Sequence, residues 1–393
     1  MNQSSSVADV APRRWTVSSL VLCTGFSLTG AGTIMLGVLL PALSQKWDLR
    51  DDKAGFLLFL QFLGSLFGAL LTGADRTRAL VAGYGLLVVS AGALAFADLH
   101  VLFAGFFFFG LGLGLAMTAT SLLFSDRYGD DRAVQLERLN FTWSAGAMIA
   151  PILLLPFLHG ASLRLLFLIF QGLFLLLFLW SLLRERPRAP RSPAPVEQEP
   201  HTTAASYELL LPLALLALCA VGVETALSGW LTTYSHRVDP HGLGNGALAT
   251  SIFMMGIVLS RLVFSTSLLG TIGRRRVLIA TLWGTAASVA LLISGHSALA
   301  IDTFAGLSGF CIGPLYPLVL SFFLERSSRG WIFAVAGIGS TVFPWITGLL
   351  SAQFGSLRFG LLAPGAATLF MIVLSAISFR SLSPSRLPTL SSS

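Results

Sequence analysis

The sequence predicts an all-α polytopic membrane protein in which twelve transmembrane helices form two six-helix bundles. Of its 393 residues, 54% are hydrophobic and only 11% are charged, whereas a soluble domain carries about 25% charged residues. Apolar runs of about 20 residues recur along the chain, and each is long enough to cross a hydrocarbon core as a helix. One polar, proline-rich stretch separates two apolar regions of similar length.

That polar stretch, residues 184–207, reads RERPRAPRSPAPVEQEPHTTAASY. Its prolines block helix propagation, and a segment this polar cannot bury enough surface to offset the entropy lost on ordering. We therefore expect a flexible linker between an N-terminal six-helix bundle, residues 1–183, and a C-terminal six-helix bundle, residues 208–393.

Each apolar segment is expected to be a helix, because a lone helix in lipid satisfies all of its own backbone hydrogen bonds. The twelve predicted spans are residues 16–44, 54–74, 79–97, 101–124, 138–158, 162–183, 208–235, 246–269, 276–295, 297–324, 330–352 and 356–379.

Lysine and arginine predict the orientation of these spans. If the N-terminus is inside, the inner segments hold 18 of these residues and the outer segments hold 6, with Arg261 left within a span. Cytoplasmic loops are enriched in positive residues. Both termini and the linker are therefore expected on the cytoplasmic side of a bacterial inner (plasma) membrane.

The two halves of the chain echo each other. The loop after the second span reads ADRTRAL, and the loop after the eighth reads GTIGRRRVL; both are short and basic. The fifth span contains SAGAMIAP and the eleventh contains VAGIGSTVFP, each rich in small residues and closed by a proline. Repeated halves around a central site are typical of secondary transporters.

Two charged residues lie deep within spans, where a charge is costly and therefore informative. Glu224 sits in GVETALSGWLTTY and Arg261 in LSRLVF. Glu224 is expected either to contact solute and carry a proton or to be a structural, hydrogen-bonded carboxyl. Arg261 is expected to have a structural or gating role, and the two residues either pair across adjacent helices or pair elsewhere.

Several uncharged side chains are candidates to line a central cavity. Trp230 and Tyr234 share one helix face, which suits stacking on a sugar ring in the cavity, an interfacial aromatic belt or helix packing. Gln61 can donate to and accept from hydroxyl groups. Asn140 and Trp143 lie on one face of the fifth span, where solute contact competes with a capping or gating role for Asn140.

Small residues predict helix packing rather than binding. Gly64 and Gly68 in the second span, and Gly110 and Gly114 in the fourth, have the GxxxG spacing that lets helix backbones approach closely. The three cysteines lie in apolar runs without metal-ligand spacing, so we expect no metal site and no cofactor. No nucleotide-binding or hydrolase motif is present, so the chain is not expected to be an enzyme.

The twelve spans, the central loop and the basic loops resemble the major facilitator superfamily. Its loop motif after the second span survives as Asp75-Arg76 with Arg78, and its second copy keeps Gly273-Arg274-Arg275. Arg261 resembles the arginine that precedes the second loop in many members. The resemblance implies gating or structural roles for Asp75, Arg76, Arg261 and Arg274, and alternating access by rocking of the two halves.

Within that superfamily, several segments are similar to the fucose permease-like sugar transporters, among them the surroundings of Gln61, LNFTWSAGAMIAP, GVETALSGWLTTY and GPLYP, which contains Tyr316. This similarity implies a monosaccharide as solute and adds Tyr316 to the candidate contacts. Proton-coupled fucose permeases carry acids in spans one and four, and this chain has none in either. The particular sugar and the coupling ion therefore stay open.

The leading prediction is a secondary transporter for a small polar solute, with a sugar and protons as its expected partners besides the lipid bilayer. One alternative is an exporter of drugs or amphipathic compounds with an apolar cavity. Another is a non-transporting sensor or assembly partner, against which the lack of a soluble signalling domain argues. We expect a monomer that does not bind nucleic acid, since the basic residues follow the membrane orientation rather than a binding patch.

Overall fold

The computed structural model describes residues 17–128, 132–184, 204–240, 246–264, 272–325 and 331–380, and within these ranges all regular structure is helical. The helices are α1 (Val17–Trp47), α2 (Asp51–Leu71), α3 (Arg76–Ala95), α4 (Leu99–Tyr128), α5 (Arg132–Leu153), α6 (Leu155–Leu158), α7 (Leu163–Arg184), α8 (Ala204–Val238), α9 (Ala247–Phe264), α11 (Arg274–Ser294), α12 (Ala298–Ile312), α13 (Leu315–Leu324), α14 (Trp331–Phe354) and α15 (Leu357–Arg380).

The predicted spans coincide with these helices, which confirms the all-α polytopic fold. In the described ranges, 11 helical stretches are long and apolar enough to cross a membrane, with α12 and α13 forming one of them. The remaining predicted span is α5. It is less apolar because Glu137 and Arg138 lie near its start, yet it packs between α1 and α9.

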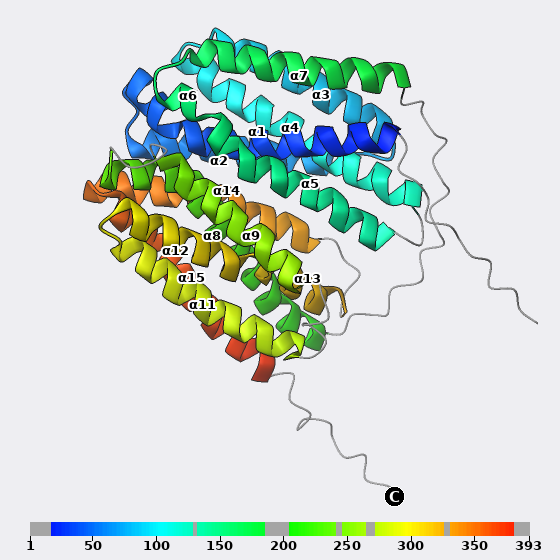
Figure 1. Cartoon of the computed structure of the whole chain (residues 1–393). Helices are drawn as coiled ribbons and strands as arrows, with labels where there is room; N and C mark the ends of the chain where they lie inside the picture. Colours follow the sequence, from blue (N-terminus) through cyan, green and yellow to red (C-terminus); the bar gives the residue numbers. More distant parts are fainter. Residues whose placement is uncertain are drawn as a thin grey trace, which may run out of the picture.

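Helices α1–α7 pack on one another, and so do helices α8–α15 (Figure 1). Among the described residues, the main contacts between the two groups come from three helix pairs: α1 with α8, α2 with α14, and α5 with α9. We call α1–α7 the first half and α8–α15 the second half. Most of the predicted linker, residues 184–207, lies outside the described residues.

Two faces of the molecule can be told apart by the helix ends. The start of α1, the end of α7, the start of α8 and the end of α15 lie on one side, which we call the termini face (Figure 1). The opposite side, where α2 begins and α14 ends, is called the distal face. Figure 1 shows the halves close together at the distal face and diverging towards the termini face.

Helices α2 and α4 pack at nearly backbone distance because glycines face each other. A Cβ added at Gly64 or Gly68 would meet the backbone of α4, and one added at Gly110 or Gly114 would meet the backbone of α2. Close approach of this kind stabilises helix pairs in lipid, where apolar burial provides no net drive. The packing interpretation of the GxxxG spacing is confirmed.

The echo between the halves is also visible in the packing. Gly146 of α5 packs against the carbonyl of Ser27 on α1, and Gly339 of α14 packs against the carbonyl of Leu218 on α8. The helices that contain the two matching small-residue segments therefore occupy equivalent places in the two halves.

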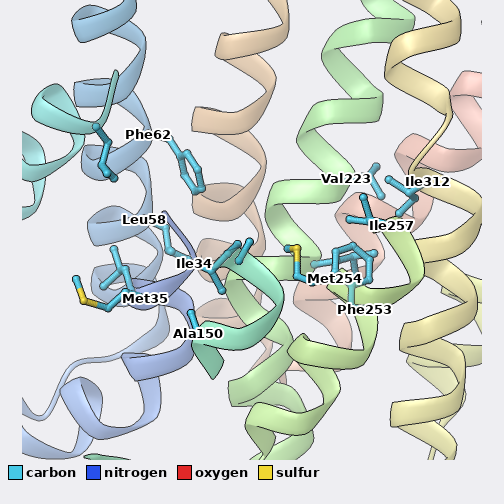
Figure 2. Packing of buried hydrophobic residues seen from close by; sticks show 14 of the residues in the cluster. Ile34, Met35, Leu58, Phe62, Ala150, Val223, Phe253, Met254, Ile257 and Ile312 are labelled. Carbon is cyan, nitrogen blue, oxygen red and sulfur yellow. The ribbon is translucent and has the colours of Figure 1, made fainter. Parts of the chain in front are cut away.

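Apolar side chains fill the space on both sides of α5. Figure 2 shows two groups of buried residues, one from each half, with Ala150 of α5 beside the first group. The first group, from α1 and α2, contains Ile34, Met35, Leu58 and Phe62; the second, from α8, α9 and α12, contains Val223, Phe253, Met254, Ile257 and Ile312. Polar groups in this surrounding are therefore conspicuous and need a structural or functional reason.

Candidate functional site

A cluster of polar side chains lies where the two halves meet. Glu224 stands at the centre of the apolar stretch Leu210–Val238 of α8, and Arg261 on the neighbouring α9 is near enough to attract it electrostatically. Tyr316 of α13 also lies within electrostatic range of Glu224. The Nη1 of Arg261 donates to the Oγ of Ser144 on α5 at 3.2 Å. Because this hydrogen bond crosses from the second half to the first, the cluster joins the halves.

The two charges of the cluster attract each other across a gap. Both Glu224 and Arg261 are half-buried, and within the described part of the chain no ion pair joins them directly. A single charge in hydrocarbon would be costly, whereas two opposite charges nearby leave the region electrically balanced. A polar group placed between them could accept a hydrogen bond from the guanidinium and donate one to the carboxylate.

A helix break brings Tyr316 into this cluster. The predicted tenth span divides at Gly313 and Pro314 into α12 and α13, and Tyr316 lies in the first turn of α13. Gly313 packs directly against Ser260, one residue before Arg261. Interrupted helices near the membrane centre are a recurrent feature of solute sites in transporters.

Among the candidate residues from the sequence, three buried polar atoms have no hydrogen-bond partner in the described part of the chain: the Nε of Arg261, the Nε1 of Trp143 and the Oε1 of Gln61. The other amide atom of Gln61, Nε2, donates to the carbonyl of Thr33 at 2.9 Å. An unpaired buried polar atom costs about 1–3 kcal/mol. Such atoms are rare in native proteins, and each one calls for an explanation by water or ligand binding.

The distal face is closed by a cluster that also joins the halves. Arg237 at the end of α8 donates to both carboxylate oxygens of Asp51, the first residue of α2, at 2.7 and 2.6 Å. Ser351 of α14 donates to the same carboxylate. We call these three residues the distal lock. Beneath it, Gly55 and Gly348 bring α2 and α14 into backbone contact, so this end of the interface is tightly packed.

The termini face has ion pairs that stay within each half. Arg76 at the start of α3 pairs with Asp126 at the end of α4, and Arg274 at the start of α11 pairs with Glu325, which follows α13. Asp75 caps α3 by accepting from the N–H of Arg78 at 3.1 Å. The basic loops that match in sequence therefore make equivalent contacts in the two halves.

The sequence profile of the Major Facilitator Superfamily matches residues 22–265, which is more than half of the chain. The chain belongs to the Major Facilitator Superfamily.

Solved structures of transporters have the same fold as this member of the superfamily. The POT family transporter PepTSo superposes with a TM-score of 0.74 at 14% identity, covering 94% of this chain and 99% of that one. A mutant of the nucleoside transporter NupG superposes with a TM-score of 0.69 at 13% identity, covering 92% and 98%. At such identities the likeness establishes the fold alone. No match was found among curated protein sequences.

Two of the predicted solute contacts, Trp230 and Tyr234, use their polar atoms in hydrogen bonds within the protein. Trp230 is fully buried, and its indole N–H donates to the carbonyl of Pro344 on α14 at 2.8 Å. Tyr234 is 1% exposed, and its hydroxyl donates to the carbonyls of Leu292 and Ile293 on α11. Both rings pack helices of the second half together, which is one of the roles expected from the sequence.

The other predicted contacts lie closer to the cluster. Trp143 directly precedes Ser144 on α5 and is half-buried, while Asn140 lies one turn away towards the termini face and is exposed. Gln61 is buried at the junction of α1, α2 and α4, within the first half. Of the predicted residues, the structure thus brings Glu224, Arg261 and Tyr316 into one region, and Trp143 adjoins Ser144, the hydrogen-bond partner of Arg261.

Sequence reasoning missed the distal lock. Asp51 and Arg237 lie 186 residues apart and each sits at a helix end, where a charge has an ordinary explanation as a helix-terminal residue. It also overlooked Asp302, a half-buried acid near the start of α12. The only signal for that residue was one acid within the apolar run ALAIDTF.

Proposed function

We propose that this protein moves a small polar solute across the membrane by alternating access to the cluster between its halves, and that the solute is a monosaccharide. The observation that carries the proposal is the pair Glu224 and Arg261, half-buried at the junction of the halves without a direct ion pair. Intramembrane charges are costly and usually mark solute or ion pathways.

The chemistry of the cluster favours a neutral, hydroxyl-bearing solute. Adjacent hydroxyls of a sugar can donate to the Glu224 carboxylate and accept from the Arg261 guanidinium at once. The unpaired N–H of Trp143 supplies a further donor beside Ser144. Since the two charges balance each other, the solute itself needs no net charge.

Binding is tested first by a thermal-shift screen of monosaccharides on the purified full-length protein, because a ligand that binds only the folded state raises its stability. We expect a subset of sugars to raise the melting temperature, and Arg261→Gln to abolish that rise. A screen in which no monosaccharide stabilises the protein, or in which Arg261→Gln responds like the parent, would contradict the proposal.

We further propose that Glu224 carries the coupling proton. Protonation would remove the negative charge that balances Arg261, so proton and solute occupancy of the cluster would be linked. Glu224→Gln keeps the shape and most hydrogen bonds but cannot titrate. In proteoliposomes it is expected to lose accumulation driven by a pH gradient while retaining solute exchange at equal pH. If gradient-driven accumulation survives in Glu224→Gln, the proton role is wrong.

The termini face is proposed to be cytoplasmic, on the basis of the arginine distribution. The structure, closed at the distal lock, then corresponds to a state closed towards the outside. Cysteines introduced at Ser192 and Thr202, outside the described residues, test this orientation. They should react with a membrane-impermeant thiol reagent only after the cells are permeabilised. Labelling in intact cells would reverse the assignment of the faces.

A further inference from the structure

A second polar site lies at the distal face, entirely within the second half. A cavity of about 490 Å³ is lined by the end of α8, the loop between α11 and α12, and the start of α15. Arg237, His296 and Arg358 are among its walls, and no carboxylate is among the described residues that line it. The cavity is separate from the cluster around Glu224, which lies at the middle of α8.

The guanidinium group of Arg358 in this cavity is held in place by hydrogen bonds within the protein. Arg358 donates to the carbonyl of Gly295 at 2.6 Å and lies 2.9 Å from the Nδ1 of His296. Tyr234, whose ring is fully buried, lies within electrostatic range of this guanidinium. The guanidinium is therefore fixed at the cavity wall. The first turn of α15 begins at Leu357 beside it, and backbone N–H groups at a helix start favour anions.

Arg237 belongs both to this cavity and to the distal lock. Its side chain is 42% exposed and lines the cavity, while its guanidinium donates to Asp51 of the first half. If the halves part at the distal face, as the proposed alternating access requires, Asp51 would move away with α2 and the charge of Arg237 would become available to the cavity. An anion in the cavity then gains a second guanidinium partner that it lacks, or must share, in the closed state.

We propose that this cavity binds a small multivalent oxyanion, phosphate or a phosphate ester, and that the bound anion favours opening of the distal face. Planar guanidinium groups bind such oxyanions in pairs of hydrogen bonds. A ligand shifts a conformational equilibrium only through its different affinity for the two states. Here that difference comes from the competition between Asp51 and the anion for Arg237. By reciprocity, weakening the lock strengthens anion binding.

The first test is titration of the purified full-length protein with inorganic phosphate at constant ionic strength, which holds charge screening fixed. Binding is followed by thermal stability, with chloride as the reference anion. We expect saturable stabilisation by phosphate. Arg358→Gln and, separately, Arg237→Gln should each weaken phosphate affinity at least tenfold. The matched control is Arg164→Gln, which removes an exposed distal-face arginine that stacks on Phe96 outside the cavity and should leave the affinity unchanged.

The decisive variant is Asp51→Asn, which removes the competitor without touching the cavity. We expect its phosphate affinity to rise by about fivefold, the lower end of ordinary coupling between sites. An unchanged or lower affinity in Asp51→Asn overturns the link to the lock. Absence of saturable phosphate binding, or equal binding in Arg237→Gln and the parent, overturns the site itself. Since solute transport is not measured, failure of this proposal is independent of the proposed solute.

Discussion

Removal of the distal lock should shift this transporter towards a state that is open at the distal face. In Asp51→Asn, the two charge-assisted hydrogen bonds from Arg237 and the one from Ser351 lose their anionic acceptor. A hydrogen bond to a charged group contributes about 1.5–3 kcal/mol when it is shielded from water, whereas an exposed ion pair contributes only about 0.2–1 kcal/mol.

The burial of the pair decides between these limits. The side chain of Asp51 is 11% exposed but that of Arg237 is 42% exposed, so the lock is partly screened by water. An intermediate value of about 1.5 kcal/mol follows, which lowers the ratio of closed to open molecules by about tenfold. Ser351→Ala removes a single donor and should produce a smaller shift in the same direction.

The distance between spin labels at Lys53 of α2 and Gln353 of α14, both exposed at the distal face, reports this shift. Asp51→Asn should add or enlarge a population at longer distance. The matched control is Asp52→Asn, which removes a negative charge from the next residue. Among the described residues, Asp52 forms an ion pair only with Arg50 of the same half, at 3.6 Å. If Asp51→Asn and Asp52→Asn give the same distance distribution as the parent, the lock does not hold the distal face closed.

Two further predictions concern packing. Gly110→Ala places a methyl group against the backbone of Gln61, so we expect the free energy of unfolding to fall by about 1–3 kcal/mol and the melting temperature in detergent to drop. Its control is Gly172→Ala in α7, which has open space around it and should keep or slightly raise the melting temperature. Trp230→Phe removes the side-chain hydrogen bond to the carbonyl of Pro344 and should cost about 0.5–1.5 kcal/mol of stability. Its solute affinity should equal that of the parent, and selective loss of affinity at unchanged stability would return Trp230 to the solute site.

The positions of the helices could be predicted because bilayer thickness fixes the length of each apolar run. The contacts of the polar residues could not, since they depend on which helices become neighbours. Glu224 and Arg261 are a natural pair by sequence, yet the hydrogen-bond partner of Arg261 is Ser144, 117 residues away on α5. The distal lock escaped prediction for the same reason: each of its charges looks ordinary at its own helix end.

Trp143 and Trp230 show how a packing residue can be told from a candidate solute contact by whether its polar group has a hydrogen-bond partner within the protein. Pro344 has no N–H, so the carbonyl of Ser340 one turn earlier is released, and the hydroxyl of Thr225 lies 3.4 Å from it. The indole N–H of Trp230 donates a hydrogen bond to the carbonyl of Pro344. Side chains of α8 thus hydrogen bond to the backbone of α14 around this proline, and the indole N–H of Trp230 is not left over for a solute.

On α5, by contrast, the indole N–H of Trp143 is buried without a partner among the described residues, as is the Nε of Arg261 in the opposite half. A protein that rocks its halves past each other cannot pair such groups permanently across the interface without resisting the motion. Groups that a solute must reach are therefore expected to remain unpaired in at least one state, at a cost of about 1–3 kcal/mol each. Solute specificity should therefore depend on Trp143 and Arg261, together with the nearby Glu224.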